Sequence, residues 1–217
     1  MTTTSDGDAI FAEIAEERRI MADALMPLTP DQWQAQSLCS AWTVRDVAAH
    51  LVMPLVTPLW KFGVTMVRYR GDFDRTNEHI TRRTRIEHGD HLPELLAVNA
   101  DSTFTPPGKG PLAPLTDILV HGQDIRRPLG LDYAIPSHRQ IAVLDFLTGY
   151  TGDTPFSTPT DGVRWQATDL DWSQGDGPLV EGPATSLMLI LTGRRCGLAD
   201  TTGPGTELLA GQMSRRR

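Results

Sequence analysis

Hydrophobic residues recur at helical spacing in four segments of the first 130 residues, the period of a helix with one buried face. These segments are residues 8–26, 43–55, 72–88 and 115–127, of which 72–88 is a polar helix, and a shorter apolar piece follows it at 91–100. We find no convincing strand pattern in this part of the chain. Four helices joined mostly by short connections predict an antiparallel helical bundle.

Prolines and capping residues indicate where these helices begin and end. Thr43 and Asp46 form an S/T-x-x-acid pair, which predicts the start of the second helix. Pro54 and Pro58 should bend that helix just after His50, because a proline lacks the backbone N–H that the helix needs. Residues 27–41 are expected to form a loop, and Asp90 is expected to cap the piece at 91–100. Proline and glycine should end the fourth helix near residue 127.

The pattern changes from Leu131 onward, where strands join the helices. Val163, Trp165 and Ala167 alternate with polar residues, which predicts a half-buried strand, and a glycine turn should lead to a second strand at 179–181. Helices are predicted at 138–150 after a Ser137 cap, at 184–194 after a proline, and at 205–213. We therefore predict an α+β protein with two domains, residues 1–132 and 133–217.

Composition narrows the function classes. The 217 residues are 40% hydrophobic and 22% charged, with a net charge of −7. An acidic chain has no reason to seek phosphate backbones or anionic lipid, so nucleic acid and membrane partners are not expected. The most apolar long stretch, 51–67, is interrupted by two prolines and Lys61. The N-terminus does not resemble a signal peptide, and we expect a soluble, cytoplasmic protein.

The two cysteines, Cys39 and Cys196, are far apart and form no CxxC pair, which is typical of a reducing compartment. Neither has a neighbouring histidine or helix start in the sequence, so no activated thiolate is expected. The GxSxG, HExxH and strand-following GxGxxG motifs do not occur.

Three polar residues in the fourth helix carry the candidate chemistry. Asp117, His121 and Asp124 fall at i, i+4 and i+7, on one side of a helix that is otherwise mostly apolar. An aspartate and a histidine one turn apart can hold a divalent metal. The alternative is a polar stripe satisfied by neighbouring side chains or lying at a domain seam.

A second histidine could complete such a site. His50 lies at the flank of the apolar stripe of the second helix, where a histidine can also be a core-edge residue with one hydrogen bond. Two histidines and one carboxylate on facing helices make a triad with open coordination positions. His50, Asp117 and His121 are the set with plausible geometry. His88 and His91 straddle a predicted helix break and are expected in a solvated turn.

Three segments together resemble one known family. WTVRDVAAHL at 42–51, DILVHGQDIRRPLG at 117–130, and the segment 162–194 are similar to segments of the mycothiol-dependent maleylpyruvate isomerase family. The resemblance implies a DinB-like four-helix bundle followed by a small α/β domain similar to sterol carrier proteins. It also implies a divalent metal, commonly zinc, held by His50, Asp117 and His121. Family members tend to have glutamate at the position of Asp117.

The resemblance further implies a thiol mechanism. Mycothiol at the open coordination position would lose its proton and attack a small electrophile, as an S-transferase or a cis-trans isomerase. An anionic substrate needs fixed cations, and Arg82 or Arg83, together with Arg194, are the candidates. They could also be surface ion-pair partners. Asp124 would orient a ligand or join the seam to the second domain.

Two other functions stay open. The apolar helix at 184–191, beside Trp165 and Trp172, could shelter a small apolar molecule in a binding protein. A metal-dependent hydrolase would place water at the position of the thiol. The residues do not separate these alternatives, and the family resemblance favours the thiol.

Overall fold

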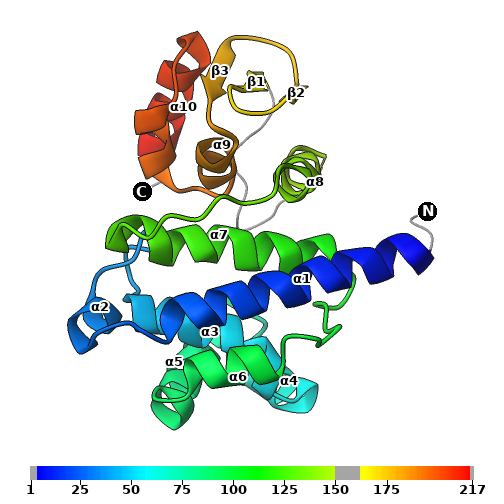
Figure 1. Cartoon of the computed structure of the whole chain (residues 1–217), viewed down its shortest axis with the longest axis vertical. Coiled ribbons are helices and arrows are strands. Elements are labelled where there is room, and N and C mark those ends of the chain that lie inside the picture. Colours follow the sequence, from blue (N-terminus) through cyan, green and yellow to red (C-terminus); the bar gives the residue numbers. More distant parts are fainter. Residues whose placement is uncertain (1–3, 150–161, 216–217) are drawn as a thin grey trace. The chain divides into compact units, whose positions relative to one another are not determined.

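The computed structural model describes residues 4–149 and 162–215, and the chain divides into two compact units between Tyr133 and Ala134 (Figure 1). The described part is mostly helical with a three-stranded sheet, which confirms the α+β class. The helices of the first unit are α1 (Thr4–Leu25), α2 (Pro30–Gln34), α3 (Val44–Val56), α4 (Leu59–Arg68), α5 (Phe73–His88), α6 (Leu92–Val98) and α7 (Leu112–Leu129).

The first unit is built around the long helices α1, α3 and α7. α1 packs on α6 and α7, while α3 packs on α5, α6 and α7, and α1 and α7 run side by side in Figure 1. The apolar faces read from the sequence form the core, with the fully buried side chains Ile14, Met21, Leu25, Val47, Leu96 and Leu119. The packing places one face of α3 directly against α7.

The predicted start of α3 is confirmed. Thr43 accepts a hydrogen bond from the backbone N–H of Asp46, and Asp46 accepts one from the backbone N–H of Thr43. The predicted Asp90 cap is wrong: α6 begins after His91, and Asp90 instead pairs with Arg45 at 3.3 Å. The loop predicted at 27–41 contains α2, whose capping box joins Thr29 and Gln32. A helix of five residues is too short to show a period in the sequence.

The prolines act later than predicted. α3 continues through Pro54 to Val56, and the chain turns by 116° between α3 and α4, beyond the predicted bend. α7 likewise runs through Pro128 to Leu129 before Gly130 ends it in the left-handed conformation. Pro128 has no N–H for the carbonyl of Asp124, four residues earlier, and the N–H of Leu38 donates to that carbonyl at 3.1 Å. This bond fastens the loop before α3 to α7.

Within the described residues, no single helix is long and apolar enough to cross a membrane, and α3 with α4 passes that test only as a sharply bent pair.

The second unit packs helices on a small sheet. It contains α8 (Ser137–Thr148), β1 (Arg164–Ala167), β2 (Ser173–Gln174), β3 (Leu179–Gly182), α9 (Ala184–Leu191), the 3-10 helix η1 (Arg195–Asp200) and α10 (Pro204–Arg215). The strand order is β2-β1-β3, with β1 antiparallel to β2 and parallel to β3. Both predicted strands are confirmed, while β2 has only two residues and gave no pattern. Ser137 is the first residue of α8 and follows Pro136, so it is not the predicted cap, and Tyr150 lies outside the described residues.

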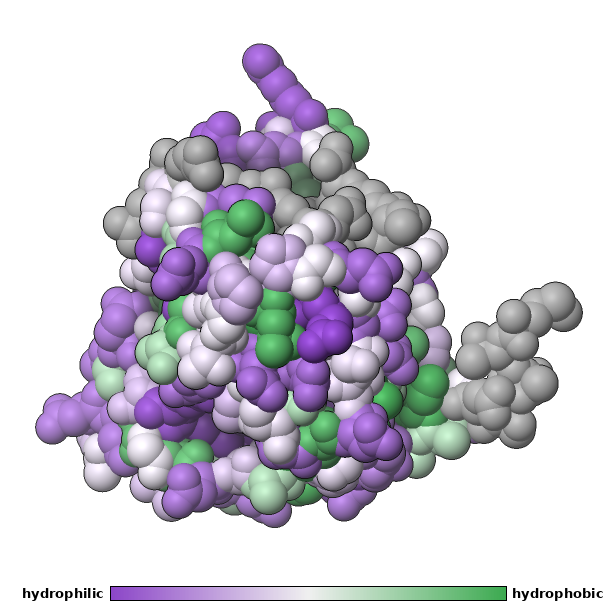
Figure 2. Space-filling model, turned by 90° about the horizontal axis from the view of Figure 1, so that it is seen from above, coloured by the Kyte–Doolittle hydropathy of each residue, from purple (hydrophilic) through white to green (hydrophobic). Residues whose placement is uncertain are grey.

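α9 lies inside this unit. Its side chains from Leu187 to Leu191 are at most 1% exposed, so they form the core. A cavity of about 330 Å³ in the unit is lined instead by Thr148, Gly162, Val163, Trp165, Gln174, Gly175 and Asp176. The part of the surface visible in Figure 2 is mainly polar, with small hydrophobic spots between the polar side chains. Within the described residues, α9 therefore supplies core side chains, and the cavity is lined by other residues.

Candidate metal centre

The packing of α3 on α7 brings His50, Asp117 and His121 together. Their ligand atoms lie within 4.8 Å of one another. Asp117 Oδ1 lies 3.5 Å from His50 Nε2 and 3.5 Å from His121 Nε2, and the two imidazole rings meet edge to face at 4.7 Å. The structure thus gathers the three residues that the sequence singled out as metal ligands.

His50 is held from two sides. Its Nδ1 lies 3.4 Å from Thr81 Oγ1 on α5, and the Trp42 ring lies 5.0 Å from the imidazole. An ion pair between Arg85 and Asp46, 3.1 Å long, ties α5 to the start of α3 and so places Thr81 against the histidine. These contacts direct Nε2 of His50 toward Asp117.

His121 is the most deeply buried of the three, with 8% of its side chain exposed against 12% for His50 and 39% for Asp117. Burial lowers its pKa below the usual value, while the carboxylates of Asp117 and Asp124 oppose that change only in part. The imidazole is therefore neutral at pH 7. Its Nδ1 lies 2.8 Å from Asp124 Oδ2, on the side of the ring away from Nε2.

This donor set fits a divalent cation. A metal binds neutral imidazole nitrogen and ionised carboxylate, which are the atoms that converge here. Ligand atoms about 2.0–2.1 Å from a tetrahedral zinc ion lie about 3.4 Å from one another, close to the 3.5 Å spacing at Asp117. A single oxygen of Asp117 reaches both histidines, so the side chain is long enough although family members tend to have glutamate.

The predicted arginines lie in different surroundings. Arg82 is exposed on α5, one residue after Thr81, whereas Arg83 forms an ion pair with Glu87 at 2.6 Å. Arg194 belongs to the second unit, where its Nη1 donates to the carbonyl of Thr192 at 2.8 Å. Their contacts with a substrate stay predictions.

Sequence reasoning missed a buried cation near the cluster. Arg18 on α1 is 5% exposed and donates to the carbonyls of Ala100 and Ser102 at 2.9 and 2.7 Å. Burial lowers its pKa, and Asp117 and Asp101 act in the opposite direction. An arginine amid the acidic residues of an amphipathic first helix gave no signal of this position.

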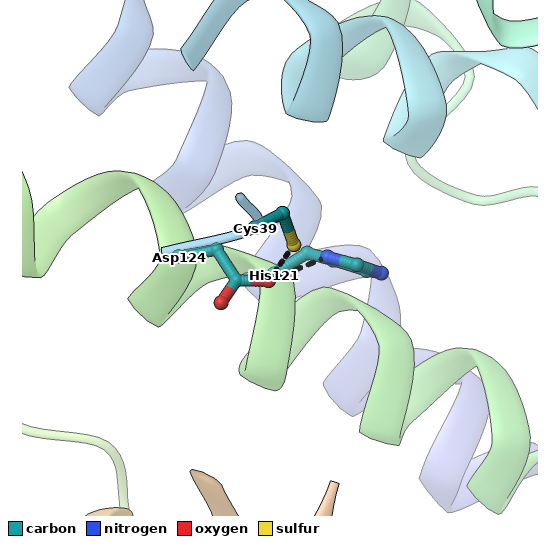
Figure 3. Close-up of side chains that lie close together, drawn as sticks. All are labelled: Cys39, His121 and Asp124. Atoms are coloured by element: carbon teal, nitrogen blue, oxygen red, sulfur yellow. Dashed lines mark hydrogen bonds and ion pairs between the residues drawn. The ribbon is translucent and has the colours of Figure 1, made fainter. Parts of the chain in front are cut away.

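Sequence reasoning also dismissed Cys39 because no histidine stands beside it in the chain. In the structure its Sγ lies 3.1 Å from Asp124 Oδ2, and Cys39, His121 and Asp124 form a second cluster of potential ligand atoms (Figure 3). The 85 residues between Cys39 and Asp124 concealed this contact. The only signal of this contact in the sequence was that Cys39 stands shortly before the WTVRD segment.

Comparisons with known proteins agree with this architecture. The family model described as "Mycothiol maleylpyruvate isomerase N-terminal domain" matches residues 14–57, the segment from α1 to the end of α3. No curated protein sequence matches the chain significantly. A solved structure titled "Crystal structure of the mycothiol-dependent maleylpyruvate isomerase" aligns with a TM-score of 0.56 and 13% identity, covering 95% of this chain and 97% of that one. The resemblance read from the sequence is thereby confirmed: the chain shares the fold of that isomerase, and its segment 14–57 matches the family's N-terminal domain.

Proposed function

We propose that this chain is a metal-dependent enzyme that uses mycothiol to act on a small electrophilic acid of the maleylpyruvate type. The observation that carries the proposal is the convergence of His50, Asp117 and His121 on one point between α3 and α7. The solved isomerase with the same fold and the matching N-terminal family model support the choice of thiol and reaction. Zinc is the metal expected for two histidines and one carboxylate.

A bound divalent cation would supply a Lewis acid that lowers the pKa of a coordinated thiol. The protein's own residues prepare for this in three ways. Burial keeps His121 neutral, so that a nitrogen lone pair is available. Thr81 and Trp42 fix the ring of His50, and Asp117 contributes the negative charge. His50, Asp117 and His121 would hold the cation and leave it an open position for the thiol.

The isomerisation itself needs no net gain or loss of atoms. The thiolate sulfur forms a bond to one alkene carbon, and the π electrons move into the conjugated carbonyl group. Rotation about the resulting single bond is followed by the reverse electron movement, which expels the thiolate and restores the alkene as the trans isomer. A substrate without a route back to the alkene would instead leave as the thiol conjugate.

The acidic substrate requires cations, for which Arg82 and Arg194 are the candidates. Arg82 is exposed and follows Thr81, which contacts His50. Arg83 is its matched control, because its guanidinium is already paired with Glu87. We expect Arg82→Ala and Arg194→Ala to raise KM for an anionic substrate, and Arg83→Ala to leave KM unchanged.

Metal analysis is the first test of this function. The purified protein should hold close to one equivalent of zinc, and His50→Ala or Asp117→Ala should lose it. A wild-type protein that binds less than about a tenth of an equivalent, even after zinc is added at pH 7, would refute the metal centre.

Thiol use is tested separately with the zinc-loaded enzyme, mycothiol and maleylpyruvate. We expect isomerisation that depends on mycothiol and is absent in His50→Ala. Zinc-dependent hydrolysis of an ester without any thiol would instead favour the hydrolase. Zinc binding with neither reaction would leave a metalloprotein without the proposed chemistry.

A further inference from the structure

Asp124 is a carboxylate with no exposed surface, and its position calls for a physical explanation. One of its oxygens, Oδ2, lies 2.8 Å from His121 Nδ1 and 3.1 Å from Cys39 Sγ. Figure 3 shows the thiol and the imidazole both directed at one oxygen of the carboxylate, with Asp124 and His121 on α7 and Cys39 on the neighbouring loop. Cys39, from outside the helix, thus contacts the Asp124–His121 pair of α7.

The loop that carries Cys39 is fixed independently of this contact. The N–H of Cys39 donates to Ser37 Oγ at 3.1 Å, and its carbonyl accepts from the N–H of Trp42 at 2.9 Å. The N–H of Leu38 donates to the carbonyl of Asp124, which Pro128 leaves without a helical donor. Hydrogen bonds of the backbone therefore hold Cys39 next to Asp124. The position of its thiol does not depend on side-chain packing alone.

The direction of the hydrogen bonds fixes the chemistry of the imidazole. We assign Asp124 as the ionised carboxylate, and because such a group only accepts hydrogen bonds, the thiol and Nδ1 of His121 both donate to Oδ2 in this assignment. The proton of the neutral imidazole then resides on Nδ1, and Nε2 keeps its lone pair. Nε2 is the atom that lies 3.5 Å from Asp117 Oδ1, inside the candidate metal centre.

The same residues could be taken for a metal site of their own, since their ligand atoms also lie within 4.8 Å of one another. A cation at that place would have to displace the protons of both Cys39 and His121 Nδ1, which already form hydrogen bonds to Asp124. It would also compete with the first cluster for His121. The hydrogen-bond chain is the arrangement that leaves the first cluster complete.

We propose that Cys39 is a positioning residue of the metal centre: its thiol steadies the Asp124 carboxylate, and this carboxylate holds His121 in the tautomer that presents Nε2 to the metal. The proposal rests on the proposed function for the role of the metal. The hydrogen-bond chain itself involves no metal, which allows the two to be tested apart.

The tautomer of His121 is measured by nitrogen-15 NMR on the metal-free protein, with the signal assigned by its loss in His121→Gln. We expect Nδ1–H in the wild type and in Cys39→Ser, whose hydroxyl still donates, and a mixture of tautomers in Cys39→Ala. Cys196→Ala is the matched control and should keep the wild-type spectrum. A wild type protonated at Nε2, or a Cys39→Ala spectrum identical to the wild type, would overturn the inference.

Cobalt binding to the wild type, Cys39→Ser, Cys39→Ala and Cys196→Ala supplies the second readout. We expect Cys39→Ala to weaken cobalt affinity about tenfold, as for other partners of metal-binding histidines, and Cys39→Ser to recover most of it. A thiolate-to-cobalt charge-transfer band that disappears in Cys39→Ala would make Cys39 a ligand and overturn its positioning role. Failure of the wild type to bind cobalt or zinc would overturn the proposed function, whereas the tautomer spectra would still decide whether Cys39 orients His121.

Discussion

Helices α7 and α9 are both rich in apolar residues, yet they bury different kinds of side chain. α9 buries Leu187, Met188 and their neighbours, together with Ser186, whose hydroxyl donates to Asp200 at 2.7 Å. α7 buries an extended polar set among its apolar residues, comprising Thr116, His121, Gln123, Asp124 and Arg126. Burying a polar group costs free energy unless a partner satisfies it, and even then the net gain is small.

The difference separates stability from chemistry within one chain. α9 contributes mainly to stability, because nearly every side chain that it buries is apolar and gains free energy on leaving water. α7 retains charges and an imidazole that an apolar helix would not need, and one of these buried groups, His121, belongs to the candidate metal centre. Substitutions in α7 should therefore change metal binding, and substitutions in α9 should change stability.

The largest effect is expected from His121→Ala. Removing one of the three proposed ligands should weaken zinc binding by about 1,000-fold or more, which corresponds to about 4 kcal/mol. The measurement is competition with a chelating dye, with circular dichroism to confirm the helical fold. His91→Ala, at an exposed turn, is the control and should bind zinc like the wild type. Equal zinc affinity in both variants would break the link between α7 and the metal.

Leu187→Ala should lower the stability of the protein and leave its zinc affinity unchanged. Leu187 has no exposed surface, and truncating such a residue costs about 2–5 kcal/mol of unfolding free energy. Urea unfolding measures this loss, and the zinc affinity of the folded protein should not change. Leu208→Ala removes the same atoms from a side chain that is 43% exposed and should cost less than about 1 kcal/mol. Similar losses at the two leucines would contradict the buried position of α9.

Arg18→Met tests stability and metal binding at one residue, because the substitution should lower the stability and raise the zinc affinity. Loss of the hydrogen bonds to Ala100 and Ser102 should cost about 2–3 kcal/mol of stability. Removing a positive charge that interacts with Asp117 should raise zinc affinity a few-fold. Arg19→Met, which breaks an exposed pair with Asp101, should cost less than about 1 kcal/mol. Urea unfolding and dye competition measure the two effects, and a fall in zinc affinity would show that Arg18 shapes the site.

Much of the first unit could be predicted because its main helices carry a local signal. The period of α1, α3, α5 and α7 and the Thr43 cap are visible in the sequence and hold in the structure. The bend after His50 was misplaced because a proline weakens a helix without always ending it, and tertiary packing carries α3 to Val56. α2 and β2 are too short for any period to appear.

The residues of the candidate site also divide into those with a local signal in the sequence and those without one. Asp117 and His121 share a helix, so their proximity follows from spacing alone, whereas His50 was added by assuming that two helices face each other. Spacing could not reveal Cys39 or Arg18, because Cys39 contacts Asp124 and Arg18 contacts Ala100 across more than 80 residues. Spacing predicts contacts within a helix, and only the packed structure reveals the residues that support them.

The smallest effect is expected at the cap of α3. Thr43 satisfies the N–H of Asp46, and its own N–H donates to the Asp46 carboxylate, so Thr43→Ala should cost about 1 kcal/mol in urea unfolding. Thr29→Ala is the matched control, because Thr29 forms the same capping box at the five-residue α2.

The two caps differ in what lies beyond them: α3 carries His50, and Asp46 also pairs with Arg85 of α5. Thr43→Ala should therefore weaken zinc binding about two- to threefold in addition, through a less firmly held α3, as expected of a distant support. Thr29→Ala should leave zinc binding unchanged. Equal zinc affinity in the two variants would mean that the packing of α3 on α7, rather than its cap, holds His50 in place.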